Sequence, residues 1–496
     1  MEIISTTANH SFRRYDKLLA MRNGIDKYEI IKELGKKLFA DSDIVKVGKV
    51  SSRDVQIVKK FIAKAITGTN PEVLSLFFEH ILIAPELGKR ITEKLVVRDL
   101  KFEVSKYEVE FLLWLHEVGR LVDPGGYLRN DIIDDNLLVS FGLPKILVQK
   151  LPNVRTFLQV GKMLELSEDQ LQGRANLNKE QEKIIADYFK LLTPTQRLIF
   201  IGDNFGKRDE KGELFSSQTF IQYVLTQEQR YSGDESWILD RRPAGAILTI
   251  KLVEKTIKWL KNMGVDFERI LNSLKEYGLK FILMVRHGDP DNPKNIVYNL
   301  DEVMKEEDRI HITDNGRRQL KALGMVIKKR KFRVARIVCS DQIRAVESEK
   351  ELNRELGVSE EQVDPRLKDL YAPGAYLEGL TMDDWKNKKG NAYDEKRWGK
   401  YKHERPEKLI DRINQVFWEN VNGLKVGEAV VLLSHGDPIA WWINQQVTGQ
   451  LPQTDALRDQ IYPNQGQAIV CIIDPQGIFF THYILTDPNL IEGESY

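Results

Sequence analysis

Apolar residues recur at spacings of three and four through most of the first 275 positions of the chain. This period is that of an α-helix with one buried face, and few stretches show the alternation of a half-exposed strand. Prolines and glycines, as in Pro124-Gly125-Gly126, mark loops between the periodic segments. The pattern therefore predicts an all-α domain over residues 1–275. Its clearest segments are 54–66, 71–95, 108–122, 179–192 and 246–263.

The pattern changes near residue 280. Helical stretches now alternate with short apolar runs that end in polar turns, and such runs are typical of buried strands. This alternation predicts a three-layer α/β domain over 276–496, with a mostly parallel sheet between two layers of helices. A short helical connector near 268–280 is expected to join the two domains. The strand candidates are 281–285, 335–339, 429–433 and 468–474, and the helix candidates are 313–330, 342–356 and 438–449.

Polar clusters directly follow the first three of these apolar runs. They are Arg286-His287-Gly288, Ser340-Asp341-Gln342-Ile343-Arg344-Ala345 and Ser434-His435-Gly436-Asp437. In sheets of this kind, ligands gather at the carboxyl ends of the strands. We therefore expect two histidines and two arginines to meet at one edge of the sheet.

These side chains suit a phosphoryl group. A guanidinium fork matches tetrahedral oxygens bidentately and keeps its charge, as expected of Arg286 and Arg344. An imidazole is a good nucleophile near neutral pH when its other nitrogen is held by a hydrogen bond. Gly288 and Gly436 would let the backbone approach the oxyanion, and helix N-termini would add amide donors.

The same clusters belong to four motifs that resemble those of the histidine phosphatase superfamily, which includes cofactor-dependent phosphoglycerate mutases and many small phosphatases. The resemblance covers about residues 281–485. Its motifs, in family order, are Arg286-His287-Gly288, TDNGRRQLKALG at 313–324, SDQIRAVESEKEL at 340–352 (similar to the family's SxxxRAxxTAxxL) and LLSHGDPI at 432–439.

The resemblance implies a role for each matching residue. His287 would be the nucleophile that becomes phosphohistidine. Arg286, Arg344 and His435 would bind the phosphoryl oxygens and stabilise the charge that develops on them. No metal or organic cofactor is expected for this domain.

The resemblance also implies a carboxyl proton donor, because an alkoxide leaves poorly until it is protonated. Asp369 stands where the family has a glutamate, one methylene longer, and is the preferred general acid. Glu378 is the alternative. After the first motif, Asp289 brings negative charge close to an anion site, so it is expected to point away or to pair with an arginine. Asn292 or Asn295 would supply a further hydrogen bond to the phosphate.

A second resemblance, over about residues 55–265, is to HD-domain phosphohydrolases, whose divalent metal is held by histidines and aspartates from several helices. His80, His116 and Asp203 stand in segments similar to the ligand helices of that family. Glu117 departs from the pattern, because the family has aspartate there. The alternatives are a divalent metal centre or a degenerate helical domain that packs, dimerises or binds a nucleotide without catalysis.

Composition narrows the partners. The chain has 74 basic and 73 acidic side chains and a net charge of +1, so no overall field favours nucleic acid or an anionic membrane. No apolar run approaches the about 20 residues of a membrane span, and the first residues do not resemble a signal peptide. The two cysteines, Cys339 and Cys471, lie far apart, so disulfides are not expected and the cytoplasm is the default compartment.

Together these features predict a two-domain phosphomonoester hydrolase that acts through a phosphohistidine on a small soluble phosphate, for instance a nucleotide or sugar phosphate. A phosphoglycerate mutase-type phosphotransferase, a metal-dependent HD-type nucleotide phosphohydrolase and a non-catalytic phosphate-binding regulatory protein remain alternatives. The sequence leaves the oligomeric state open.

Overall fold

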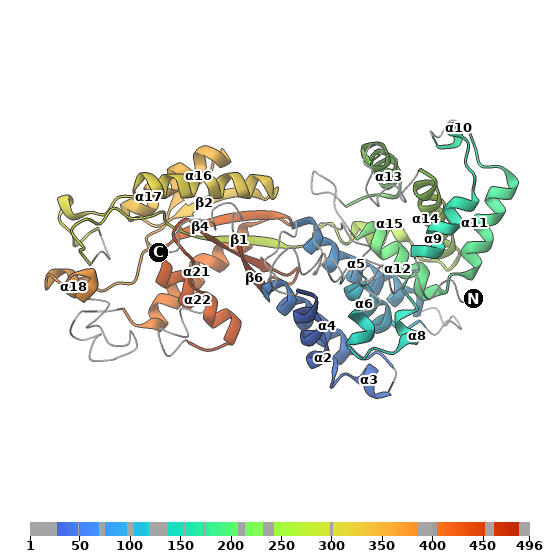
Figure 1. The fold of residues 1–496 in the computed structure, drawn as a ribbon, viewed down its shortest axis with the longest axis horizontal. Coiled ribbons are helices and arrows are strands. Elements are labelled where there is room, and N and C mark those ends of the chain that lie inside the picture. Colours follow the sequence, from blue (N-terminus) through green and yellow to red (C-terminus); the bar gives the residue numbers. More distant parts are fainter. Residues whose placement is uncertain are drawn as a thin grey trace. The chain divides into compact units, whose positions relative to one another are not determined.

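The chain divides into two compact units, Met1–Tyr277 and Gly278–Tyr496 (Figure 1). Within the part whose placement is given, no helix has the length and apolar character to cross a bilayer. The computed structural model describes residues 27–47, 49–68, 75–96, 104–116, 118, 137–151, 154–171, 175–206, 214–231, 243–297, 301–384, 400, 402, 404–451 and 461–485.

The first unit is helical, as the spacing of its apolar residues predicts. Its helices are α2 (Lys27–Phe39), α3 (Asp43–Val47), α4 (Ser52–Gly68), α5 (Ser75–Val96), α6 (Lys106–Leu115), α8 (Lys145–Val148), α9 (Val154–Met163), α10 (Glu168–Leu171), α11 (Lys179–Leu191), α12 (Pro194–Phe205), α13 (Ser217–Tyr231), α14 (Pro243–Asn262) and α15 (Phe267–Asn272).

Helices α5, α6 and α12 pack against one another in this unit. Helix α12 begins sharply, because the Thr193 hydroxyl accepts from Gln196 N while the Gln196 side chain accepts from Thr193 N, and proline occupies the first helical position. Apolar side chains such as Ile83, Leu113 and Ile199 are fully buried. This packing fixes the positions of the polar side chains that the three helices also carry.

The second unit is built on a six-stranded sheet with the order β3-β2-β4-β1-β5-β6. Its first four strands in that order are parallel, while β5 runs antiparallel to β1 and to β6. The mostly parallel sheet is therefore confirmed, and the run at 468–474 forms its antiparallel member. The strands are β1 (Lys280–Arg286), β2 (Arg333–Cys339), β3 (Glu361–Val363), β4 (Glu428–Ser434), β5 (Ala468–Ile473) and β6 (Phe479–Leu485).

Helices cover both faces of this sheet. Figure 1 shows α16 and α17 on one face and α21 and α22 on the other. The second face holds a core cluster that includes Trp441, Trp442 and Phe417, all fully buried. The helices are α16 (Asp314–Lys329), α17 (Ile343–Leu356), α18 (Pro373–Leu377), α21 (Pro406–Gly423) and α22 (Gly436–Thr448), with 3-10 turns at Glu306–Asp308 and Pro365–Leu367.

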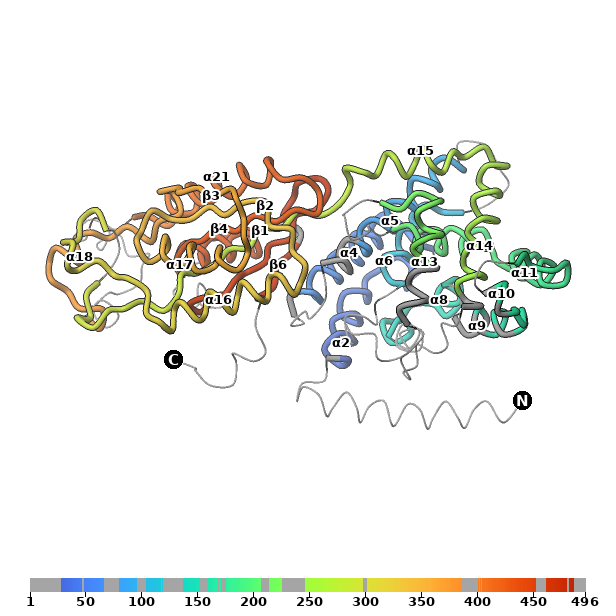
Figure 2. The backbone as a smooth tube through the Cα atoms, turned by 90° about the horizontal axis from the view of Figure 1, so that it is seen from above, coloured from blue at the N-terminus to red at the C-terminus, as the bar shows by residue number. Residues whose placement is uncertain are grey.

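The strand register places the polar clusters side by side. Strands β2, β4 and β1 are neighbours in the sheet, seen from above in Figure 2. Arg286 pairs with Ser434 at the end of β1 and β4, and Cys339 pairs with Leu433 at the end of β2. The residues that follow these pairs therefore leave the sheet at one edge, as the sequence predicts for parallel strands.

Candidate active site

Two imidazoles face each other at this edge. His287 directly follows β1, and His435 directly follows β4 and precedes α22. Their ring centroids lie 5.1 Å apart, and both rings are buried. The structure thus brings together two histidines that are almost 150 positions apart in the sequence.

The hydrogen bond of His287 determines which of its nitrogens is reactive. Nδ1 lies 2.7 Å from the carbonyl oxygen of Gly288, so Nδ1 carries the proton and donates it. The lone pair is then on Nε2. Burial, followed by the charges of Arg344 and Arg286, keeps the pKa of His287 well below its usual value. The ring is therefore neutral near pH 7 and can act as a nucleophile.

Arg344 is fully buried at the start of α17. Its Nη2 donates to Gln342 Oε1 at 2.7 Å and to Asp369 Oδ2 at 3.1 Å, and its Nη1 lies 3.9 Å from Asp301 Oδ1. These carboxylates balance a charge that burial would otherwise make costly. They also fix the guanidinium plane next to the histidines.

Arg286 is the second guanidinium of the cluster. Its Nη1 donates to the carbonyl oxygen of Pro463 at 3.0 Å, and the group lies 5.1 Å from the centre of the Tyr462 ring. Its Nε is buried and has no hydrogen-bond partner among the residues that the structure describes. A bound anion would supply such a partner.

His435 is connected to the neighbouring strand end and to the candidate acid. Its Nε2 lies 3.1 Å from Ser340 Oγ, and its Nδ1 lies 3.7 Å from Asp369 Oδ2. Burial is the largest cause that keeps the pKa of His435 well below its usual value, and Arg344 and His287 act in the same direction. We therefore expect this ring to be neutral as well.

Asp369 lies within the cluster. Besides its contacts with Arg344 and His435, its Oδ1 accepts a hydrogen bond from Leu370 N at 2.8 Å. Burial raises the pKa of Asp369, Arg344 opposes this, and Asp437 adds to it. The carboxyl group therefore holds a proton more readily than an exposed aspartate, which suits a general acid.

Glu378 lies elsewhere. Its side chain is 42% exposed at the end of α18, and Oε2 lies 3.6 Å from Lys400 Nζ. Within the described part of the chain, no hydrogen bond or ion pair joins it to His287 or Arg344. The geometry therefore favours Asp369 over Glu378 as the proton donor.

The two glycines are required for close packing. A side chain on Gly288 would place its Cβ 2.7 Å from the carbonyl oxygen of Gly316 in α16. A Cβ on Gly436 would collide with the ring and hydroxyl of Tyr462. A role of either glycine in approaching the oxyanion stays a prediction.

The segment after the first motif makes contacts of its own. Asp289 Oδ2 accepts from the Thr313 hydroxyl at 2.9 Å, so its charge is directed to the start of α16 and not to an arginine. The Asn292 side chain donates to Ile296 O and accepts from Ile296 N. Asn295 donates to Asp383 Oδ2 at 2.8 Å. Phosphate binding by either asparagine is a prediction that these contacts do not support.

Two residues of the cluster were missed by the sequence analysis. Arg412 of α21 donates to the carbonyl oxygens of Arg366, Lys368 and Asp369, and Glu404 accepts from the same guanidinium. It thereby holds the loop that carries Asp369, although nothing in its amphipathic helix marks it. Gln342 accepts a hydrogen bond from Arg344. The sequence could have indicated this residue, because it is a polar position inside the second cluster.

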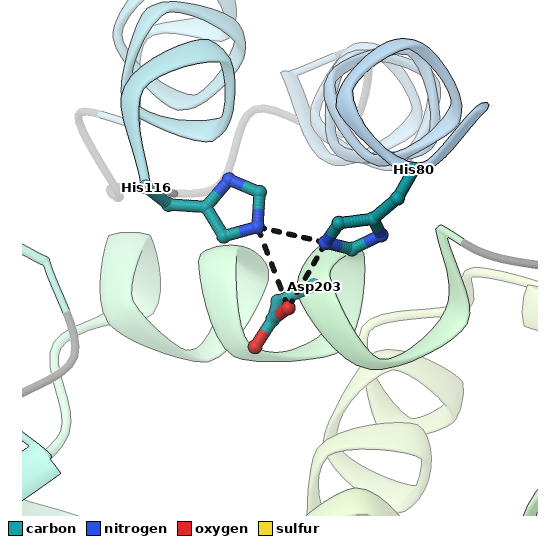
Figure 3. A group of neighbouring side chains, drawn as sticks. All are labelled: His80, His116 and Asp203. Atoms are coloured by element: carbon teal, nitrogen blue, oxygen red, sulfur yellow. Dashed lines mark hydrogen bonds and ion pairs between the residues drawn. The ribbon is translucent and has the colours of Figure 1, made fainter. Parts of the chain in front are cut away.

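In the first unit, His80 of α5, His116 at the end of α6 and Asp203 of α12 converge, as Figure 3 shows. The two Nε2 atoms lie 3.0 Å apart, and they lie 3.2 and 3.4 Å from Asp203 Oδ1. Glu117 lies outside the described residues.

The tautomers of these two histidines suit a cation. His80 Nδ1 lies 2.9 Å from the carbonyl oxygen of Gly206, and His116 Nδ1 lies 2.5 Å from that of Leu113. If both Nδ1 atoms donate, both Nε2 lone pairs face each other beside a carboxylate. Such an arrangement is stable when a cation lies between them, and imidazole and carboxylate are common ligands of divalent metals. The donor set therefore fits a divalent metal ion.

Residues 282–477 match the sequence profile described as histidine phosphatase superfamily (branch 1). These residues belong to the histidine phosphatase superfamily. The match covers about two-fifths of the chain and contains the histidine pair, both arginines and Asp369. This match indicates that the domain is a phosphatase or a phosphoglycerate mutase-like enzyme. No curated protein matches the sequence.

Solved structures are similar to about two-fifths of the chain. A mycobacterial glucosyl-3-phosphoglycerate phosphatase is 22% identical, with 41% of this chain and 96% of that chain covered and a TM-score of 0.33. A putative α-ribazole-5'-phosphate phosphatase from Escherichia coli is 15% identical, with 42% and 96% covered and a TM-score of 0.33. At these values the likeness says nothing of the substrate.

Proposed function

We propose that the histidine phosphatase domain hydrolyses phosphomonoesters through a phosphohistidine at His287. In the first step, Nε2 of His287 forms a bond to phosphorus, the bond to the leaving oxygen breaks, and Asp369 gives its proton to that oxygen. In the second step, a water oxygen attacks phosphorus while the Asp369 carboxylate takes a proton from the water. The phosphorus–nitrogen bond then breaks, and inorganic phosphate leaves.

The observation that carries this proposal is the hydrogen bond from His287 Nδ1 to Gly288 O at 2.7 Å. It supports a lone pair on Nε2 of a buried and neutral ring. Arg344, which follows β2, and Arg286, at the end of β1, are close enough for their charges to lower the pKa of this ring. Fixed guanidinium groups of this kind stabilise the charge that develops on the phosphoryl oxygens.

We propose a small soluble phosphate ester as the substrate, with nucleotide and sugar phosphates as the first compounds to assay. A mutase would use the same nucleophile and phosphate ligands, His287, Arg286, Arg344 and His435. It would, however, transfer the phosphoryl group back to its product. Incubation with 2,3-bisphosphoglycerate and 3-phosphoglycerate distinguishes the two, because a mutase interconverts phosphoglycerates and a phosphatase releases inorganic phosphate. A non-catalytic phosphate-binding protein would do neither.

The direct test measures hydrolysis of p-nitrophenyl phosphate by the full chain with and without a chelator. We expect activity that survives chelation, is abolished by His287→Ala and is retained by His311→Ala. His311 is a matched control, because it is exposed and pairs with Glu347. Quenching with labelled substrate should trap phosphohistidine in the wild type alone. Full activity of His287→Ala would refute the proposal.

For the helical unit, over the proposed domain 1–275, we propose an HD-like fold with a divalent metal centre at His80, His116 and Asp203. The supporting observation is that two Nε2 atoms and one carboxylate oxygen lie within 3.4 Å of one another. Metal analysis of the dialysed protein should find about one equivalent of metal in the wild type. Asp203→Asn should reduce it, and Asp187→Asn, on an exposed part of α11, should not.

This second proposal allows an HD-type phosphohydrolase. Its activity on a panel of nucleotides would be abolished by chelation and by His116→Ala but retained by His287→Ala. Metal binding without such activity would instead indicate a degenerate domain. If the wild type holds no metal at any divalent concentration tested, the metal centre is refuted.

A further inference from the structure

Gln342 lies between Arg344 and Asp369, two residues of the candidate active site. It is the residue before α17, and its side chain does not cap that helix. Its Oε1 instead accepts hydrogen bonds from Arg344 Nη2 at 2.7 Å and from Asp369 N at 3.4 Å. The side chain is only 2% exposed. A neutral carboxamide thus connects the guanidinium of the site with the backbone of the candidate acid.

These two contacts determine the orientation of the carboxamide. Arg344 Nη2 and Asp369 N are both donors, so the atom that faces them must be the oxygen. Nε2 therefore points away from them with two protons to donate. It is buried and has no hydrogen-bond partner among the described residues. Buried amide nitrogens are normally hydrogen-bonded in folded proteins, so this donor is available to a partner that a bound ligand would bring.

The unpartnered donor belongs to the anion site and not to a separate pocket. Arg286 Nε and His435 Nδ1 are also buried and also lack a hydrogen-bond partner in the described part of the chain. The turn that carries Gln342 contacts His435 as well, because Ser340 Oγ accepts from Gln342 N and lies 3.1 Å from His435 Nε2. Gln342 and His435 are thus connected through Ser340, and each carries one of these buried nitrogens.

We propose that Gln342 is a further substrate ligand, whose Nε2 donates a hydrogen bond to a phosphoryl oxygen beside Asp369. This inference rests on the proposed phosphatase function. The motif around Arg344, similar to SxxxRA, leaves the position of Gln342 unspecified, so the motif does not assign this role. An oxygen with negative charge would accept the proton, and hydrogen bonds to charged groups are about twice as strong as those between neutral groups.

Two substitutions separate the donor from the acceptor of this side chain. Gln342→Met fills a similar volume and removes both. Gln342→Glu keeps an oxygen for Arg344 Nη2 and Asp369 N but replaces the donor by an oxygen that repels the phosphoryl group. Gln362→Met is the matched control, because Gln362 is exposed on β3.

The measurements are the inhibition constant of orthovanadate and kcat/KM for p-nitrophenyl phosphate, with circular dichroism to confirm folding. For Gln342→Met we expect both to worsen by about 10- to 100-fold, the range of one hydrogen bond to a charged group. Gln342→Glu should be at least as impaired, and the control should match the wild type.

Two outcomes would overturn the proposal. Folded Gln342→Met with wild-type values would show that the side chain does not touch the anion. Recovery of wild-type values by Gln342→Glu, after loss in Gln342→Met, would show that Gln342 only positions Arg344 and Asp369. Failure of the proposed function is distinguishable, because then the wild type itself would not turn over phosphomonoesters, while its binding of orthovanadate would still report on Gln342.

Discussion

Replacing Asp369 by asparagine separates the delivery of a proton from the binding of phosphate. The asparagine side chain has nearly the same shape, and its oxygen can still accept from Leu370 N, as Asp369 Oδ1 does at 2.8 Å. It cannot give a proton to the leaving oxygen. Burial raises the pKa of Asp369, which favours the protonated form that a general acid needs.

The size of the loss should depend on the leaving group. General acid catalysis contributes about 10²- to 10⁴-fold, which corresponds to about 3–5 kcal/mol of activation free energy. An alkyl ester such as glycerol 3-phosphate needs all of this help, because an alkoxide is a poor leaving group. p-Nitrophenyl phosphate needs little, because p-nitrophenolate is a stable anion. We therefore expect a loss of about 10²-fold or more for the alkyl ester and less than about 10-fold for the aryl ester.

The assay is rapid quenching of single turnovers, since it isolates the formation of phosphohistidine from its hydrolysis. Asp369 would also serve the second step, so the variant should accumulate phosphohistidine with the aryl ester. Asp314→Asn, at the fully exposed start of α16, serves as the control. Equal losses for the two esters in the formation step would refute the assignment of Asp369 as general acid.

Other predictions follow from named contacts. Burial lowers the pKa of His287, so kcat/KM should not decline as pH falls through 6.5, as a pH profile would show. The free energy of unfolding should decrease below that pH, because the unfolded state then binds more protons, and urea titrations measure this decrease. Arg412→Met should lower the free energy of unfolding by about 2–4 kcal/mol, because it removes one partner of a largely buried ion pair, and it should reduce kcat more than it raises KM. Burial and Glu361 raise the pKa of Glu349 to about 7, so its contribution to stability is lost as pH rises from its unfolded pKa to about 7. Glu349→Gln should therefore stabilise the protein by about 1–2 kcal/mol at pH 8 and hardly at pH 4, as measured by urea denaturation.

The parallel strands could be predicted from the sequence because the residues that identify each of them are adjacent in the chain. Each apolar run is followed at once by its polar cluster, so the end of the strand and the chemistry are read from the same few residues. The run at 468–474 contains no such marker. An apolar segment buried on both faces looks the same whichever way it runs, and only its pairing with β1 and β6 shows that β5 is antiparallel.

The carboxyl donor was harder to predict, because its position depends on contacts from distant parts of the chain. Asp369 lies in an irregular loop, and spacing alone left Glu378 as an alternative. The structure favours Asp369, because Arg412 of α21 binds the backbone carbonyl oxygens of the loop that carries it. No hydrophobic pattern identifies an arginine that binds the backbone carbonyl oxygens of another segment. The same holds for Gln342, whose importance depends on where its carboxamide points.

The charges around a pair of histidines, more than the pair itself, indicate which ligand it suits. The rings of His80 and His116 have centroids 5.0 Å apart, and those of His287 and His435 are 5.1 Å apart. A carboxylate oxygen lies beside the first pair, so a positive ion would complete it. Burial and, after it, arginine charges lower the pKa values of both rings of the second pair. Because the charges beside this pair are positive, an anion would complete it. The proposed metal centre and the proposed phosphoryl site thus follow from one electrostatic argument applied to opposite surroundings.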